Sequence, residues 1–220
     1  LPYLVYLRHP TMGGVFASWG SLGHVTAAEP GALIGFLGPR VYEHLYGEPF
    51  PTGVQTAENL HRHGVIDGVV PIELLRSTLD RALTVLSDAP GTPPNAPAAE
   101  PVADVPAWDS VEISRRPDRP GIGYLLRHGT TERVLLSGTG GHGEAATTLL
   151  ALARFGGQPA VVVGQQRGVG GGLAGPQALR EARRGMALAA GLRLPLVLVI
   201  DTPGPALSAE AEEGGLASEI

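Results

Sequence analysis

A proline- and alanine-rich segment in the middle of the chain constrains the fold more than any other feature. Residues 87–105 read SDAPGTPPNAPAAEPVADV and carry no periodic apolar face. A segment of this composition is typical of an extended, semi-rigid linker. The sequence therefore predicts two folded blocks, residues 1–87 and 107–220, joined by a linker at 88–106.

The first block alternates strand-like runs with helical patterns. Strands are expected at 3–7 and 32–37, and helices at 15–22, 41–46 and 73–86. The run from Thr52 to Gln55 has the spacing of a capping box and predicts a further helix that continues to His61. The apolar face expected for the helix at 73–86 consists of Leu75, Leu79, Ala82, Leu83 and Leu86.

The second block contains a strand–helix–strand pattern, with strands expected at 160–163 and 196–200 and a helix at 177–190. A further helix is expected to begin at Ala209. The stripe predicted to face the core of the helix at 177–190 is Leu179, Ala182, Met186 and Ala189. Alternation of this kind indicates the α/β class, with helices that cover a sheet.

Two missing residue types exclude several kinds of chemistry. All 16 basic residues of the 220 are arginine, and the chain has no cysteine. A Schiff-base lysine, a phosphate-loop lysine, a cysteine nucleophile and a disulfide are therefore excluded in this segment. The net charge of −5 disfavours a nucleic-acid partner, and no apolar run is long enough to span a membrane. The first residues do not resemble a signal peptide, so a cytoplasmic location is expected.

Met12, Gly13 and Gly14 lie at an expected strand-to-helix junction. Paired glycines allow a ligand to approach the backbone, and amides at a helix start favour negative charge. Such a turn can form an oxyanion hole from backbone donors alone. A plain tight turn is the alternative that the spacing leaves open.

Two other glycine motifs resemble nucleotide sites only formally. Residues 170–175 match G-x-G-x-x-G, but the preceding strand ends several residues earlier and Asp201 comes later than a dinucleotide fingerprint requires. We interpret this stretch as a flexible loop. Residues 201–204 read DTPG, which resembles a GTPase switch, but the chain lacks the lysine that such a protein needs. A strand-end turn with Gly204 at positive φ is the remaining interpretation.

Longer segments carry a resemblance to a known family. Residues 10–18 (PTMGGVFAS) and 28–41 (AEPGALIGFLGPRV) resemble the β half of the carboxyltransferase of bacterial acetyl-CoA carboxylase. Residues 151–159 (ALARFGGQP), 163–168 (VGQQRG), 194–204 (LPLVLVIDTPG) and 211–214 (AEEG) resemble its α half. The segments follow the family's order, as in a fused β-then-α polypeptide whose joint is the linker. The abrupt ends of the chain indicate an internal fragment.

The resemblance implies a crotonase-type fold in each half and transfer of a carboxyl group from carboxybiotin to an acyl-CoA. The biotin anion would take the α-proton of the thioester, so the protein supplies backbone donors for two oxyanions. Gly13 and Gly14 would form one donor pair, expected to face biotin. The other residues that the resemblance places at substrate or cofactor are Thr11, Met12, Gly38, Pro39, Arg40, Gln165, Gln166, Arg167, Thr202, Pro203 and Gly204. No metal is expected in this segment.

The expected partners are acetyl-CoA, a biotin carboxyl carrier protein, a biotin carboxylase and further copies of the same chain. The segment lacks the family's zinc ribbon and its second glycine pair, so it is expected to be inactive alone. His9 and Pro205 also depart from the family pattern. Carboxylation of propionyl-CoA or longer acyl groups, a non-catalytic paralogue that acts in assembly, and a nucleotide-binding module are the alternatives.

Overall fold

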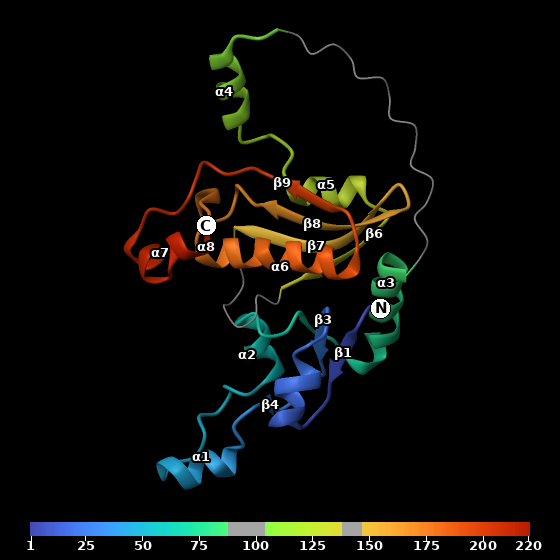
Figure 1. The fold of residues 1–220 in the computed structure, drawn as a ribbon, viewed down its shortest axis with the longest axis vertical. Coiled ribbons are helices and arrows are strands. Elements are labelled where there is room, and N and C mark those ends of the chain that lie inside the picture. Colours follow the sequence, from blue (N-terminus) through green and yellow to red (C-terminus); the bar gives the residue numbers. More distant parts are fainter. Residues whose placement is uncertain (88–103, 138–146) are drawn as a thin grey trace.

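The computed structural model describes residues 1–87, 104–137 and 147–220 (Figure 1). The elements of the first block are β1 (Leu4–Leu7), β2 (Thr11–Met12), the π-helical turn η1 (Phe16–Gly20), β3 (Val25–Ala28), β4 (Ile34–Gly35), α1 (Pro39–Tyr46), α2 (Ala57–Arg62), β5 (Gly68–Val69) and α3 (Ile72–Ser87). Parallel pairing joins β1, β3 and β5 in one small sheet and β2 and β4 in another. The core of this block is formed by Leu7, Ala28, Ala32, Ile34, Ala57 and Ile66.

The second block is built on one four-stranded sheet. Its elements are α4 (Ala107–Arg115), α5 (Ile122–Gly129), β6 (Glu132–Leu136), β7 (Thr148–Phe155), β8 (Gln158–Gln165), the 3-10 turn η2 (Gly170–Gly172), α6 (Pro176–Leu192), β9 (Leu196–Val199), α7 (Ala209–Glu213) and α8 (Leu216–Glu219). The strand order is β6-β7-β8-β9, with antiparallel pairing through β8 and a parallel β8–β9 pair. Asp201 therefore follows β9 at the same edge of the sheet where β8 ends.

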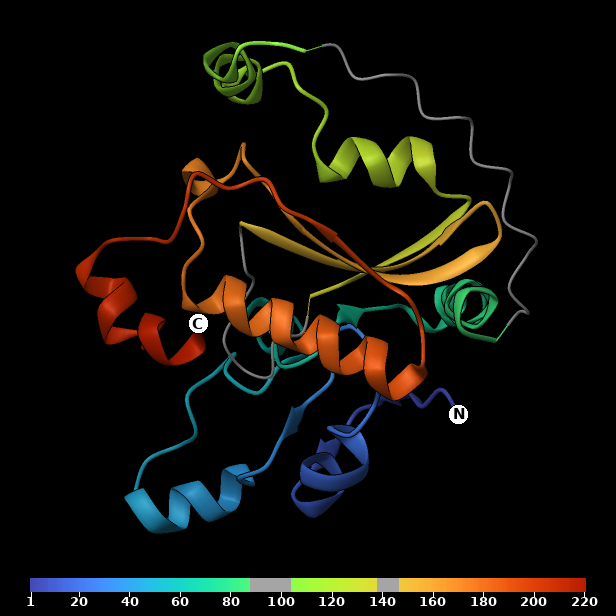
Figure 2. The same ribbon diagram turned by 45° about the horizontal axis from the view of Figure 1, so that its top comes forward.

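Helices cover both faces of this sheet, with α5 on one face and α6 on the other (Figure 2). Successive residues of β7 point to opposite faces. Leu150 and Leu152 pack on the α6 side, whereas Ala151 and Ala153 pack on the α5 side. Each fully buried leucine contributes about 1.5–3 kcal/mol to folding, so burial against the helices stabilises the block.

The first block reaches the second through α3. This helix packs against β6 and β7, and its Val85 is completely buried in the same cluster as Leu150 and Leu152. Arg154, a buried residue of β7, donates a hydrogen bond to the carbonyl oxygen of Thr84 at 2.7 Å. The predicted boundary at residue 87 thus follows a helix that already lies on the second sheet. The predicted linker at 88–106 lies mostly outside the described residues.

Most of the predicted elements are confirmed. The strands at 3–7, 160–163 and 196–200 correspond to β1, β8 and β9, and the helices at 41–46, 73–86 and 177–190 correspond to α1, α3 and α6. The capping-box prediction at Thr52 is wrong. The α2 helix begins four residues later, where the Thr56 hydroxyl oxygen accepts a hydrogen bond from the Asn59 amide at 3.3 Å. The strand expected at 32–37 is reduced to Ile34–Gly35.

The apolar stripes predicted for the two long helices are partly wrong. In α3, Leu83 is 41% exposed and Val85 takes its place in the core. In α6, Met186 is 47% exposed, and the buried residues are Ala178, Glu181, Gly185, Leu188 and Ala189. A glutamate and a glycine on the core side hide this face from an apolar-periodicity search. Of the helices in the described ranges, none is long and apolar enough to cross a membrane.

Gly185 lets α6 approach the sheet closely. A β-carbon there would overlap the Val163 side chain and lie 3.1 Å from Leu150 Cδ1. We expect Gly185→Ala to lower the free energy of unfolding by about 1–3 kcal/mol, as overpacking does. Gly191→Ala on the same helix is the matched control, because its β-carbon would lie 4.0 Å from the nearest atom, His24 Nε2. Urea unfolding should show a lower midpoint for Gly185→Ala and an equal or higher one for Gly191→Ala. Equal midpoints for both variants would contradict the close approach.

Candidate active site

The Met12-Gly13-Gly14 segment forms a strand–turn–helix. Met12 ends β2, Gly13 has φ +67°, and Gly14 opens the helical turn that continues into η1. Side chains rarely adopt that φ, so Gly13 is required by the backbone conformation. The Gly13 amide donates to the Gly35 carbonyl oxygen at 2.9 Å, whereas within the described residues the Gly14 amide has no acceptor. Gly14 is therefore the donor that this turn can offer to a ligand.

The surroundings of this turn are apolar and open. Two hydrogen bonds hold Thr11 in place. Its amide donates to the Leu33 carbonyl oxygen, and its hydroxyl donates to the Arg8 carbonyl oxygen. Beyond it, four large apolar side chains are each more than 60% exposed, namely Val15, Trp19, Leu22 and Phe36. An exposed apolar area of this kind indicates a surface that another molecule covers.

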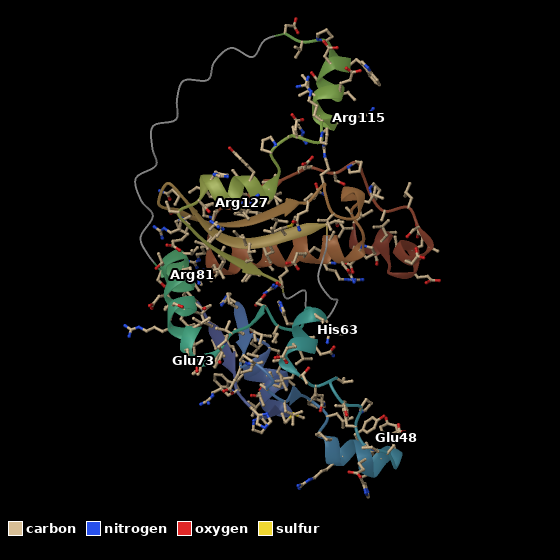
Figure 3. All side chains as sticks on the ribbon, turned by 180° about the vertical axis from the view of Figure 1, so that it is seen from behind. Glu48, His63, Glu73, Arg81, Arg115 and Arg127 are labelled. Carbon is tan, nitrogen blue, oxygen red and sulfur yellow. The ribbon has the colours of Figure 1, made fainter. Side chains whose placement is uncertain are left out.

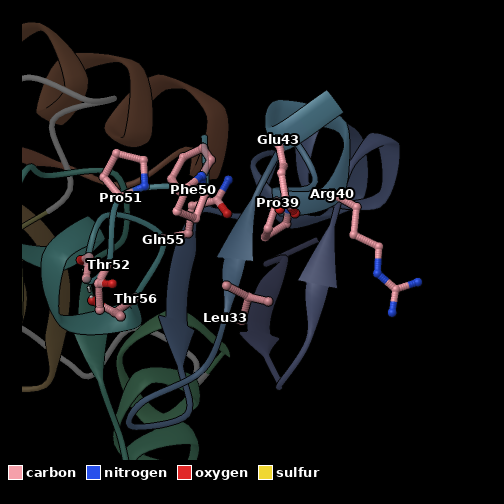
Figure 4. Close-up of a pocket in the computed structure, with 11 residues that line it drawn as sticks. Leu33, Pro39, Arg40, Glu43, Phe50, Pro51, Thr52, Gln55 and Thr56 are labelled. Carbon is pink, nitrogen blue, oxygen red and sulfur yellow. Dashed lines mark hydrogen bonds between the residues drawn. The ribbon is translucent and has the colours of Figure 1, made fainter. Parts of the chain in front are cut away.

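Gly38, Pro39 and Arg40 form the start of α1, beside a cavity of about 370 Å³ (Figure 4). Pro39 and Arg40 line this cavity, but the Arg40 side chain points away from the other lining residues. Gln55 lies on the opposite wall and donates from Nε2 to the Leu37 carbonyl oxygen at 2.6 Å. This cavity is separate from the Gly13–Gly14 turn.

Gln165, Gln166 and Arg167 follow one another at the end of β8 and line a larger hollow of about 730 Å³. Asp201, just after β9, lines it too. The Asp201 amide donates to Gln165 Oε1 at 2.8 Å, so the two strand ends are tied together. Strand ends of this type are frequent ligand sites in α/β proteins.

Asp201 also binds two arginines. Its Oδ1 lies 2.6 Å from Arg119 Nη2 and 2.6 Å from Arg167 Nη2. Arg167 donates in addition to the Ser114 carbonyl oxygen. The Asp201 side chain is only 10% exposed, whereas Arg119 and Arg167 are 35% and 34% exposed. The carboxylate thus anchors both guanidinium groups and leaves part of each facing the hollow.

Thr202, Pro203 and Gly204 form a turn next to the glycine-rich segment. The Thr202 hydroxyl donates to the Gly172 carbonyl oxygen at 2.6 Å and accepts from the Gly204 amide at 3.1 Å. Gly204 has φ +140°, which confirms the positive φ predicted for it. The stretch expected to be a flexible loop instead forms η2 and then pairs at Ala174 with Pro205.

The predicted site residues lie in separate places within one chain. The α1 cavity is at one end of the molecule, whereas the hollow at Gln165–Arg167 is near the other end, beside α4 and α5 (Figures 1 and 2). Sequence reasoning missed Arg115, Arg116, Arg119 and Asp201 as lining residues. The run RRPDRP at 115–120 was the available signal, since it places three arginines in five positions. In the three described ranges, no three His, Cys, Asp or Glu side chains are arranged to hold a metal ion.

Comparisons with known proteins identify the family. The carboxyl transferase domain model matches residues 1–220. The chain is 77% identical over 222 residues to the probable biotin-dependent acyl-coenzyme A carboxylase beta3 subunit of Mycobacterium tuberculosis, covering 100% of this chain and 45% of that protein. It is 37% identical over 242 residues to the acetyl-coenzyme A carboxylase carboxyl transferase subunits beta/alpha of Salinispora arenicola, covering 100% of this chain and 42% of that protein.

Solved structures show the same fold. Transcarboxylase 12S with methylmalonyl-coenzyme A and methylmalonic acid bound superposes with a TM-score of 0.75 at 20% identity, covering 100% of this chain and 42% of the other. A single-chain, multi-domain long-chain acyl-CoA carboxylase superposes with a TM-score of 0.76 at 20% identity, covering 100% of this chain and 21% of the other.

The chain belongs to the carboxyl transferase domain family, and it spans less than half the length of these relatives. The predicted family is therefore confirmed. The predicted fold class, α/β of the crotonase type, is also confirmed. The division into two half-domains joined by a linker stays a prediction.

Proposed function

We propose that this chain is part of the carboxyltransferase component of a biotin-dependent acetyl-CoA carboxylase, which makes malonyl-CoA in the cytoplasm for fatty acid synthesis. The observation that carries the proposal is the Gly13–Gly14 turn, with its unengaged Gly14 amide at a helix start. The family match over the whole chain supports the reaction class. Relatives named acetyl-coenzyme A carboxylase carboxyl transferase subunits beta/alpha support acetyl-CoA as the substrate.

The turn can stabilise the charge that develops when a carboxyl group is transferred. When it is bound, carboxybiotin supplies the carboxyl group. A biotin carboxylase would carboxylate the biotin, and a biotin carboxyl carrier protein would present it. The Gly14 amide would donate to the oxyanion that forms at the urea or thioester oxygen. A preformed donor of this kind contributes about 10²–10³-fold in rate. The donor acts most strongly where water is excluded.

The exposed apolar side chains near the turn support an oligomer in this proposal. Gly14 is exposed in a single chain, as are Val15, Trp19, Leu22 and Phe36. A second copy of the chain, placed over these side chains, would bury them and lower the local dielectric. The transcarboxylase 12S structure is described as a hexamer assembly, which is in line with a homo-oligomer.

A longer acyl group is the second candidate. The relative at 77% identity is named as an acyl-coenzyme A carboxylase subunit, without a stated acyl chain. Propionyl-CoA or longer substrates therefore belong in any test. His9 and Pro205, the two residues that depart from the family pattern, both make contacts within the fold. His9 Nδ1 accepts a hydrogen bond from the Leu33 amide at 3.1 Å, and Pro205 forms a β-bridge with Ala174.

The experiment is carboxyl transfer by the full-length protein, run in reverse. Malonyl-CoA, methylmalonyl-CoA and longer carboxyacyl-CoA esters would each be offered with free biotin, and carboxybiotin formation would be measured. We expect turnover with malonyl-CoA at the highest kcat/KM, and none with the 220-residue chain alone. A higher kcat/KM with methylmalonyl-CoA would replace acetyl-CoA by propionyl-CoA as the substrate. A folded full-length protein without turnover on every ester would contradict the enzyme proposal.

A further inference from the structure

Gln55 lies just before α2 and is buried, although its side chain is polar. Figure 3 shows Glu48 next to α1 and His63 next to α2, and Gln55 lies in the segment between them. Only 9% of the residue is exposed. Its Nε2 donates to the Leu37 carbonyl oxygen at 2.6 Å, whereas within the described residues its Oε1 is buried without a hydrogen-bond partner. A buried polar atom without a partner costs free energy, so stability alone does not explain a glutamine at this position.

Gln55 holds β4 from the edge opposite to the glycine turn. On one edge of β4, the Gly13 amide donates to the Gly35 carbonyl oxygen at 2.9 Å. On the other edge, the Ile34 amide donates to the Gln55 backbone carbonyl oxygen at 2.9 Å. The Gln55 side-chain amide then reaches Leu37, just beyond the end of the strand. β4 therefore lies between Gln55 and the turn.

The Gln55 side chain also lies directly on Gly35. A β-carbon at Gly35 would lie 2.4 Å from Gln55 Nε2 and 2.8 Å from Gln55 Cδ. The missing side chain at Gly35 is thus what admits the Gln55 amide to the backbone of β4. β2 and β4 each have only two residues, so few hydrogen bonds fix one strand against the other. A contact that holds the end of β4 therefore affects where the Gly14 amide points.

We propose that Gln55 is a positioning residue for carboxyl transfer, which holds Gly35 and Leu37 in place and thereby fixes the direction of the Gly14 amide. This inference rests on the proposed function, in which that amide stabilises an oxyanion. Gln55 does not contact the substrate in this proposal, because its Oε1 is buried and its Nε2 is already bonded to Leu37. An oxyanion donor acts through its geometry, and a displacement of about 1 Å can cost about 10²-fold in rate.

The test is Gln55→Met in the full-length protein, with malonyl-CoA-dependent carboxylation of free biotin as the assay. Methionine keeps the length of the side chain and removes its hydrogen-bond donor. We expect kcat to fall roughly 10–10²-fold, while the KM for malonyl-CoA changes less than about twofold, because only the transition state loses an interaction. The urea midpoint should stay close to that of wild type, because the substitution also removes the unpaired Oε1.

Amide hydrogen exchange gives a second measurement, which needs no turnover. In Gln55→Met, peptides that contain Gly13 should exchange roughly tenfold faster than in wild type, because a looser β4 opens the hydrogen bond between Gly13 and Gly35 more often. Thr52→Val is the matched control, because Thr52 is exposed and lines the same cavity as Gln55. This variant should match wild type in both kcat and hydrogen exchange.

The inference is overturned if Gln55→Met keeps the wild-type kcat, if only its KM changes, or if exchange at Gly13 is unchanged. A lower urea midpoint with faster exchange across the whole first block would also overturn it, since Gln55 would then be a purely structural residue. If wild type shows no turnover with any ester, the proposed function fails, whereas the exchange measurement still decides whether Gln55 holds the turn.

Discussion

Replacing Arg184 with methionine is expected to lower the free energy of unfolding by about 3 kcal/mol, the lower end of the range for breaking a buried ion pair. Arg184 lies on α6, and its Nη2 contacts both carboxylate oxygens of Asp67, at 2.8 and 3.0 Å. The Asp67 side chain is only 5% exposed, and its Oδ2 also accepts from the Thr26 amide at 2.9 Å. Methionine keeps the volume of the side chain and removes the charge that offsets this buried carboxylate.

The size of the loss should depend on pH because of Glu181, one helical turn before Arg184. Glu181 is 2% exposed, and burial raises its pKa to about 7, although Arg184 lowers that pKa and Asp67 raises it. The folded state therefore holds a proton that the unfolded state releases near pH 4.5, and stability falls as the pH rises toward 7. Without Arg184 the pKa of Glu181 rises further, so the deficit of the variant should be larger at pH 8 than at pH 5.

Arg183→Met is the matched control for this prediction. Arg183 is the next residue on α6, is 65% exposed and pairs with Glu219 at 2.8 Å. Exposed pairs contribute about 0–1 kcal/mol, so this variant should unfold close to wild type. Adding Asp67→Asn to Arg184→Met should restore part of the loss in urea unfolding, because it removes the buried charge. Equal midpoints for Arg183→Met and Arg184→Met would show that the ion pair joining α6 to the first block contributes little.

The sequence predicted the helices and strands whose signals are local. The amphipathic patterns of α3 and α6, and the glycine that ends α1, were enough to place these helices. Gly47, in the left-handed conformation at φ 72°, ends α1 directly after the predicted range 41–46. The sequence patterns failed where a helix face carries a polar residue or no side chain at all, as at Glu181 and Gly185.

The β7–β8 hairpin shows a signal that was present and went unused. Residues 148–155 read TLLALARF, an apolar run buried on both faces, and such a run does not distinguish a strand from a helix. Gly156 and Gly157 follow, with φ values of 54° and 85°, and Phe155 pairs directly with Gln158. Paired glycines between apolar runs are a strong hairpin signal. That turn also sets the register that brings Gln165 to the rim of the hollow.

The candidate site was predictable only in part, because its geometry depends on contacts between distant residues. The Gly13–Gly14 turn follows from adjacent residues. The Arg119–Asp201 pair joins residues 82 positions apart, which no local pattern can reveal. The engagement of the Gly13 amide by Gly35 likewise depends on the β2–β4 pairing. The sequence therefore indicated the glycines as a turn, and the resemblance assigned both amides as donors, whereas in the structure the Gly13 amide is bonded to the Gly35 carbonyl oxygen.

Gly14→Pro in the full-length protein is expected to reduce kcat for carboxyl transfer by about 10²–10³-fold, the usual effect of losing one oxyanion donor. Proline lacks the amide hydrogen and is well tolerated at the first position of a helix, where no intrahelical bond is lost. Gly13 is a poorer target. At φ +67° any other residue would be strained, and its amide is already bonded to Gly35. The measurement is malonyl-CoA-dependent carboxylation of free biotin.

Gly14→Ala separates the amide from the glycine itself. A β-carbon at residue 14 would meet no atom within 4 Å, and the amide hydrogen stays, so this variant should retain nearly the wild-type rate. Far-UV circular dichroism and thermal unfolding would show whether each variant keeps the fold. If folded Gly14→Pro transfers carboxyl groups at the rate of wild type, the Gly14 amide is not the donor. If Gly14→Ala loses as much rate as Gly14→Pro, space at the turn matters rather than the hydrogen bond, because only the proline removes the donor.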